Sequence, residues 1–329
     1  MTASPDASTV TLGQGREFDL IRRFIAGAGE MPGEVRVGPG DDATVLGGGL
    51  ILSTDLSVED VHFRRAWLTD EEIGFRAAAA ALSDLAAMAA SPVGILLSMA
   101  APRGGAVDLE ALQRGARAAA TQVGAAVLGG DLSRSPGPMV LDVTVVGRTA
   151  WPVLRNGALP GDELWVTGTL GSAAAAVRAW EAGDEPAEPF RASFARPTPR
   201  TEEARCLAEW EILHALIDLS DGLAGDAGHL AAASGVRVVV EADSVPVAPA
   251  VVQAMGASEG LDLALHGGED YELCFAAPAG GMDVEGFRQR FGVGVTRVGR
   301  VEEGEGVWLE QAGEIQPVGG GFDHLGEAS

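Results

Sequence analysis

Carboxylates recur in this sequence where apolar, strand-like runs begin or end. Asp41 and Asp42 follow a Gly-Pro-Gly turn in "VGPGDDATVL", and Asp55 ends the run "LILSTD". A single Gly-Asp-Asp is an ordinary turn, so only the repeated placement of acids at such positions indicates a functional site. Ligands of open α/β sheets bind beyond the strand ends, and the pattern therefore predicts one acidic ligand site. The other members of this set are Asp131, Asp218, Asp221, Glu269 and Asp270.

Asp84 differs because it lies inside a predicted helix, residues 69–90, on a face shared with alanines. A buried carboxylate is costly unless an arginine or a metal ion neutralises it, and both partners remain open at this point. The acidic set includes no His or Cys cluster, which disfavours zinc. Mg²⁺ prefers oxygen ligands and bridges carboxylates to phosphates, so we expect several Mg²⁺ ions and a nucleotide.

Two further features could bind phosphate. In "LSDGL", Ser220 is predicted to be the N-cap of a helix, where its hydroxyl and the free N–H groups could receive phosphate oxygens. Gly168-x-x-Gly171 is a weaker candidate, for which a structural turn is the favoured interpretation. The chain contains no lysine, since all 23 basic residues are arginines. This excludes a Walker A loop and Schiff-base chemistry on lysine.

Composition limits the class of protein. The chain has 329 residues and a formal charge of −24, which disfavours nucleic acid and anionic membranes as partners. No apolar run reaches the length of a membrane span, and the first residues do not resemble a signal peptide. Cys206 and Cys274 share no metal-binding spacing, so we expect buried thiols in a reducing cytoplasm.

Strands and helices alternate along the chain, which predicts an α/β or interleaved α+β fold. A capping box, Thr69 with Glu72, marks the start of the helix at 69–90. Helices are also expected at 16–30 and 108–123, and the proline-rich stretch 183–200 is expected to be a loop. The predicted organisation is a loose tail at 1–14, a first domain at 15–149 and a second at 150–329.

Several stretches, taken in order, resemble the thiamine-monophosphate kinases, a branch of the group that includes aminoimidazole ribonucleotide synthetase. They are "GPGDDATVL", "STDLSVEDVHF", "ALSDLAAMAASP", "GGDLSR", "RNGALPGDELWVTGTLG", "RPTPR", "IDLSDGL" and "GGEDYELCF". The resemblance implies two α/β domains, the first with a mixed sheet that dimerises into a barrel and the second with a sheet flanked by helices. It also implies a homodimer that binds ATP and thiamine monophosphate.

The resemblance assigns roles to individual positions. Phe322 stands where the family often has tyrosine, so ring stacking is kept and a hydroxyl contact is lost. The implied metal ligands are Asp42, Ser53, Thr54, Asp55, Asp84, Asp131, Asp218 and Asp221, of which Asp131, Asp218 and Asp221 are also taken as catalytic. The implied ATP contacts are Gly130, Arg155 and Ser220, and the implied substrate contacts are His62, Glu269 and Phe322.

The implied reaction is direct in-line transfer from ATP to thiamine monophosphate. A phosphate monoester has a second pKa near 6, so the acceptor is already mostly an oxyanion and needs no base. A covalent phosphoenzyme is the rival mechanism.

Three relatives of the group are the alternatives of the same class. The reactive Cys and Lys of selenophosphate synthetases are absent here, as is the C-terminal Cys of the hydrogenase-maturation relative, and aminoimidazole ribonucleotide synthetase lacks the "GGEDYE" pattern. A non-catalytic sensor of nucleotide or thiamine phosphate is the alternative of a different class.

Overall fold

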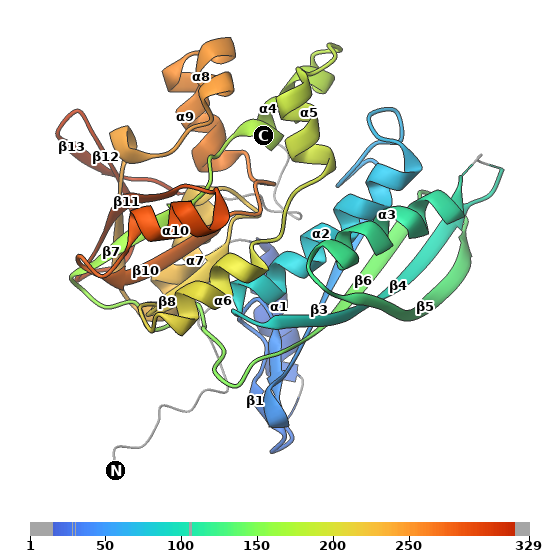
Figure 1. Ribbon diagram of the computed structural model, residues 1–329, viewed down its shortest axis with the longest axis horizontal. Helices are drawn as coiled ribbons and strands as arrows, with labels where there is room; N and C mark the ends of the chain where they lie inside the picture. Colours follow the sequence, from blue (N-terminus) through green and yellow to red (C-terminus); the bar gives the residue numbers. More distant parts are fainter. Residues whose placement is uncertain (1–15, 28, 30, 105–106, 320–329) are drawn as a thin grey trace.

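The computed structural model describes residues 16–27, 29, 31–104 and 107–319, and these form two mixed β-sheets with helices packed on them (Figure 1). The predicted fold class, two units each built from a mixed sheet and helices, is confirmed. Each sheet has two edge strands, so the described chain contains no closed barrel. The predicted tail at 1–14 lies outside the described residues.

The first sheet consists of β1 (Val35–Val37), β2 (Thr44–Leu46), β3 (Leu50–Val58), β4 (Ser91–Pro102), β5 (Ala126–Ser135) and β6 (Val140–Arg148). Its strand order is β1-β2-β3-β6-β4-β5, and β4 and β5 are its one parallel pair among the described strands. Side chains of β6 alternate between buried and partly exposed, as expected when helices cover only one face of a sheet.

Helices α2 (Asp70–Ala87) and α3 (Leu109–Gln122) cover that face, as Figure 1 shows. The predicted capping box is confirmed, because Thr69 accepts the Glu72 N–H and Glu72 accepts the Thr69 N–H. The two helices approach closely at glycines: a Cβ on Gly74 would lie 1.9 Å from the Leu112 carbonyl oxygen. This close approach fixes α2, which carries Asp84 toward the second sheet.

The second sheet consists of β7 (Asp162–Thr167), β8 (Ala215–Asp218), β9 (Arg237–Glu241), β10 (Leu273–Pro278), β11 (Val295–Glu302), β12 (Gly306–Gln311) and β13 (Glu314–Pro317). Its order is β13-β12-β9-β11-β7-β10-β8, antiparallel except where β12 meets β9. The strand β8 is one edge of this sheet and contacts α2, so its final residue, Asp218, lies at the border with the first half of the chain.

The helices of the second half pack in three places. On one face of the sheet, α7 (Leu223–Ser234) and α9 (Ala257–His266) share a core with it, and α6 (Thr201–Glu209) and α10 (Val284–Phe291) cover part of the other face. Helices α4 (Ser172–Glu181) and α5 (Glu188–Ala195) join the core of the first half, next to α2, and α8 (Pro249–Met255) precedes α9. The site described below therefore lies between elements of both halves.

The structure corrects several local predictions. The segment 183–200 is not all loop, because Pro189 occupies the first turn of α5, where proline is tolerated, and Phe190 and Phe194 lie one turn apart and are buried. Asp55 and Asp131 do not end their strands, since ladder pairing continues to Val58 and Ser135.

Two helices begin or end a few residues from where the sequence predicts. The helix expected at 16–30 is observed as α1 (Arg16–Gly27), and the one expected at 108–123 is α3. No helix in the described part of the chain has the length and apolar character needed to cross a membrane.

Candidate active site

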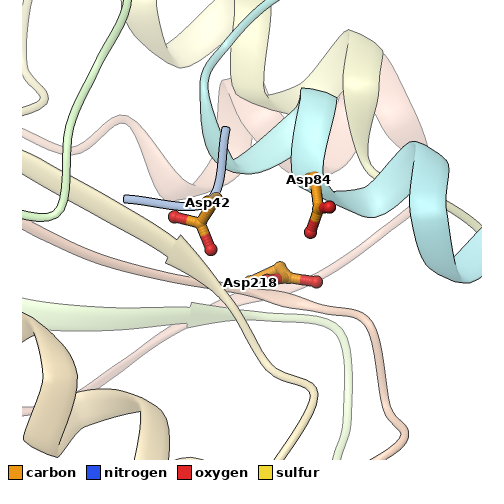
Figure 2. Close-up of side chains that lie close together, drawn as sticks. All are labelled: Asp42, Asp84 and Asp218. Carbon is orange, nitrogen blue, oxygen red and sulfur yellow. The ribbon is translucent and has the colours of Figure 1, made fainter. Parts of the chain in front are cut away.

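Three carboxylates from distant parts of the chain lie together (Figure 2). Asp42 comes from the loop before β2, Asp84 from the last turn of α2, and Asp218 from the end of β8. One oxygen of each lies within 4.8 Å of the others, a spacing at which a single cation can contact all three. The sequence prediction that these three acids share a site is thus matched by their positions.

Burial and mutual repulsion make this cluster unfavourable without a cation. Burial, and then the charge of Asp42, raise the pKa of Asp218 to about 7. Burial and the charges of Asp218 and Asp42 likewise raise the pKa of Asp84 well above its ordinary value. In the described structure Asp84 has no arginine partner, so the salt-bridge interpretation of this residue is not supported and the metal interpretation is favoured.

Arg155 is the cation that the chain itself brings to the cluster. Its Nε donates to Oδ2 of Asp42 at 3.0 Å and its Nη2 donates to Oδ1 at 2.6 Å, a two-pronged contact typical of arginine and carboxylate. Its backbone N–H donates to Asp41 at 3.2 Å. Burial, and then the charge of Asp42, raise the pKa of Asp41 to about 7. One arginine therefore faces at least four acids.

Ser53 belongs to the same cluster. Its Oγ lies 2.6 Å from Oδ2 of Asp84 and 3.0 Å from the carbonyl oxygen of Asp42, so it connects β3 to both acids. Next to the cluster is a cavity of about 650 Å³, bordered by both halves of the chain. Among the residues predicted from the sequence, those that line it are Thr54, Asp55, His62, Asp84, Asp218, Ser220, Asp221 and Glu269.

The opposite end of the cavity is aromatic. Trp67, Phe194 and Tyr271 line it, and Trp67 stacks on Trp180 with ring centroids 5.0 Å apart. His62 also lines the cavity, and its Nδ1 accepts the backbone N–H of Val58 at 3.1 Å. One end of the cavity is thus suited to phosphate with cations, and the other to a flat organic ring.

Two predicted site residues lie away from the cluster. Asp131 and Gly130 are exposed on β5, and three strand spacings separate Asp131 from Leu56 of β3, which is about 14 Å. Thr54 borders the cavity, but its hydroxyl donates to Asp142 at 2.7 Å on the sheet face that no described helix covers. One copy of the described chain therefore does not bring Asp131 to the other acids.

The two predicted phosphate-binding features are Ser220 and the loop from Gly168 to Gly171. Ser220 is not an N-cap, because α7 begins at Leu223 after Gly222, whose φ of 98° is unfavourable for a residue with a side chain. The Gly171 N–H donates to the partly buried carboxylate of Asp270, at 3.0 and 3.1 Å, which supports the structural interpretation of that loop. Phe322 lies outside the described residues.

Sequence reasoning missed several charged residues of the cavity, and the one buried among them is Arg76. It precedes Asp84 by eight positions on α2, with Ala80 midway, and all three line the cavity. Residues four apart in a helix lie on one face. This four-residue spacing could have placed Arg76 on the same helix face as Asp84. It does not indicate which residues of the second half the guanidinium contacts.

Comparisons with known proteins place the chain in a family. Residues 40–149 match the family model of the AIR synthase related protein, N-terminal domain, and residues 160–310 match that of the C-terminal domain. The thiamine-monophosphate kinase of Salmonella typhimurium is 35% identical over 280 residues, which cover 82% of this chain and 85% of that protein. The resemblance inferred from the sequence motifs is confirmed.

Solved structures agree with this result. The thiamine-monophosphate kinase of Stenotrophomonas maltophilia is 37% identical, with a TM-score of 0.75 and coverage of 90% of this chain and 96% of that one. The complex described as AaThiL with AMPPCP and TMP is 29% identical, with a TM-score of 0.78 and coverage of 95% and 97%.

Proposed function

This chain belongs to the thiamine-monophosphate kinases, within the AIR synthase related family, and we propose that it transfers the γ-phosphoryl group of ATP to thiamine monophosphate. The main support for this proposal is the cavity, which has an acidic end and an aromatic end, together with a related protein whose structure was solved as a complex with AMPPCP and TMP. A reaction that consumes ATP, and two buried free thiols, are consistent with a cytoplasmic enzyme.

The acidic end fits Mg²⁺. Its donors are carboxylate and hydroxyl oxygens, and burial together with neighbouring carboxylates raises the pKa of both Asp84 and Asp218, which a bound cation would offset. Mg²⁺ would supply neutralisation of the negative charge on the transferring phosphoryl group. The residues we propose to hold it are Asp42, Ser53, Asp55, Asp84, Asp218 and Asp221.

The remaining work of the chain is to position two phosphates. Arg155 and Ser220 are proposed to contact ATP, and the cavity orients the acceptor so that one of its phosphate oxygens attacks the γ-phosphorus. The bond to the β–γ bridging oxygen breaks, and ADP leaves with that electron pair. The acceptor oxygen is already ionised, so none of the described histidines has to act as a base.

We also propose that the enzyme is a homodimer formed through the uncovered face of the first sheet. Leu56, Leu96 and Leu128 expose 50%, 37% and 52% of their surface on that face. Asp131 lies on the same face by its register with Ser98. A second copy packed there would bury the leucines and could bring its own Asp131 to this site, which accounts for a motif acid that one chain leaves isolated.

The activity is tested by incubating the protein with Mg²⁺, ATP and thiamine monophosphate and separating the products by chromatography. We expect thiamine diphosphate and ADP in equal amounts. Binding of ATP without formation of ADP would indicate the sensor instead. Radiolabelled ATP alone should leave no label on the protein, and a labelled side chain would favour the phosphoenzyme mechanism.

The dimer is tested by Leu96→Arg, with Val284→Arg as the matched control, because Val284 is 40% exposed on α10, away from the uncovered face. Sedimentation equilibrium should show that Leu96→Arg is a monomer with little activity and that the control remains a fully active dimer. A dimeric Leu96→Arg would contradict this interface.

A further inference from the structure

Arg76 is a buried cation that the reaction outlined above does not use. Its side chain is 5% exposed, in the second turn of α2. With a rise of 1.5 Å per residue, it lies about 12 Å along the helix from Asp84, at the aromatic end of the same cavity. Buried arginines are retained only where several groups match them, so its contacts indicate its role.

Three contacts from the second half of the chain fix this guanidinium. It forms an ion pair with Glu269, and its Nη1 donates to the carbonyl oxygen of Phe194 at 2.7 Å. Its central carbon also lies 3.7 Å from the centre of the Phe194 ring. Only a planar cation such as guanidinium can make these contacts together, because it donates hydrogen bonds in its plane while its face stacks on the aromatic ring.

Glu269 is held from a second side as well. Tyr271 is buried, and its hydroxyl donates to Oε2 of Glu269 at 2.7 Å, the same oxygen that faces Arg76. The backbone at Glu269 and Tyr271 has φ values of 65° and 50°, a strained conformation for residues with side chains. The Glu269 side chain is still 26% exposed and lines the cavity. Its carboxylate is thus fixed in place and balanced in charge.

We propose that Arg76 is a positioning residue for the organic part of the substrate. It holds Glu269 so that this carboxylate accepts a hydrogen bond from an amino group on an aromatic heterocycle, such as the aminopyrimidine of thiamine. It also cancels the charge of Glu269, so that cations gather at the acidic end and not here. This inference rests on the proposed function.

The test compares Arg76→Met and Arg76→Lys with wild type in steady-state kinetics. For Arg76→Met we expect the KM for thiamine monophosphate to rise at least tenfold, with kcat and the KM for ATP changed less than twofold. Arg76→Lys should recover part of the loss, since it restores the charge but not the planar contacts.

The control is Arg191→Met. Arg191 pairs with Glu72 on the adjacent turn of α2, at 2.7 and 2.8 Å, but does not line the cavity. Arg191→Met should lower the melting temperature and leave the KM for thiamine monophosphate unchanged. Two results would overturn the positioning role. One is an equal rise in the KM for thiamine monophosphate in Arg191→Met and Arg76→Met. The other is a rise in the KM for ATP in Arg76→Met as large as the rise in the KM for thiamine monophosphate.

Two measurements keep the inference testable if Arg76→Met fails to fold or if wild type shows no turnover. Tyr271→Phe removes the second donor to Glu269 and should raise the same KM about two- to fivefold; an unchanged KM would overturn the inference. Calorimetry of thiamine monophosphate without ATP should show binding at least tenfold weaker to Arg76→Met than to wild type, and an intermediate affinity for Arg76→Lys. Dependence on Arg76 without turnover would refute the kinase and keep the inference, whereas turnover without that dependence would do the opposite.

Discussion

The two ends of helix α2 carry charge in opposite ways. At its N-terminal end, Glu72 and Arg76 are each matched by a partner from another segment, Arg191 and Glu269. Near its C-terminal end, Asp84 faces Asp42 and Asp218, and Arg155 forms an ion pair with Asp42 of this trio. The charges at the first end are balanced within the protein chain, whereas the second end keeps excess negative charge that the proposed cations would balance.

The pKa values express this difference. Burial would raise the pKa of Glu72, but hydrogen bonds from Arg191 and Thr69 lower it to about 2. Burial and the neighbouring charge of Asp42 raise that of Asp218 to about 7. A carboxylate with a lowered pKa stabilises the fold at neutral pH, and one with a raised pKa weakens it until a ligand binds. One helix therefore combines a structural end with a functional end.

Replacing Asp84 by a neutral residue should reduce activity without destabilising the fold. We expect Asp84→Asn to lower the rate of thiamine diphosphate formation about 1,000-fold, because charge stabilisation of several kcal/mol is lost. Its melting temperature without metal should rise, since repulsion with Asp218 disappears. The control is Glu285→Gln, on the exposed surface of α10. Near-normal activity of Asp84→Asn would contradict the metal assignment.

Removing the charge of Glu72 should destabilise the fold without affecting the binding of ATP. Glu72→Gln loses the two-pronged contact with Arg191 and part of the capping box, so we expect a loss of about 2 kcal/mol in the free energy of unfolding. Urea denaturation measures this. The KM for ATP should stay at the wild-type value, and a large change in it would show that the two ends are not independent.

Changing the pH should sharpen the comparison. The pKa of Asp218 is about 7 when folded against an ordinary 3.8, so without metal the folded protein holds a proton that the unfolded chain releases. Stability of the metal-free protein should therefore fall as pH rises from about 4 to 7. Mg²⁺ requires the deprotonated form, so its affinity should rise by up to about tenfold per pH unit for each proton displaced.

Thermal melts with and without Mg²⁺ measure this effect. The increase in melting temperature that Mg²⁺ produces should be larger at pH 8 than at pH 6 in wild type and nearly constant in Asp84→Asn. An equal increase at both pH values in wild type would show that no buried carboxylate is titrating at the site.

The smallest expected effect concerns the cap of α2. Thr69→Ala removes the oxygen that accepts the Glu72 N–H, which should cost about 1 kcal/mol in the free energy of unfolding. Activity with saturating Mg²⁺ should remain unchanged, because Asp84 is anchored by the contact with α3 and by Ser53. A loss of activity larger than twofold would show that fraying at one end reaches the other.

Much of the site could be predicted from the sequence. Local chemistry marks the acids of "GPGDDATVL", "ALSDL" and "IDLSDGL", the cap at Thr69, and the absence of lysine. Strand limits were less accurate: Asp55 and Asp131 seemed terminal because the residues after them are less apolar, whereas pairing with β6 and β4 extends both strands. Ladder hydrogen bonds depend on neighbours that sequence periodicity does not show.

The sequence by itself determined the kind of chemistry, because residue types fix which ions and groups can be bound: oxygen donors for Mg²⁺, arginines for phosphate and carboxylate. Only the tertiary structure decided which charges are balanced. Arg76 and Phe194 are 118 positions apart, and Asp84 and Asp218 belong to different halves. Electrostatic energy depends on distance and burial, and both are set by how α2 packs between the two sheets.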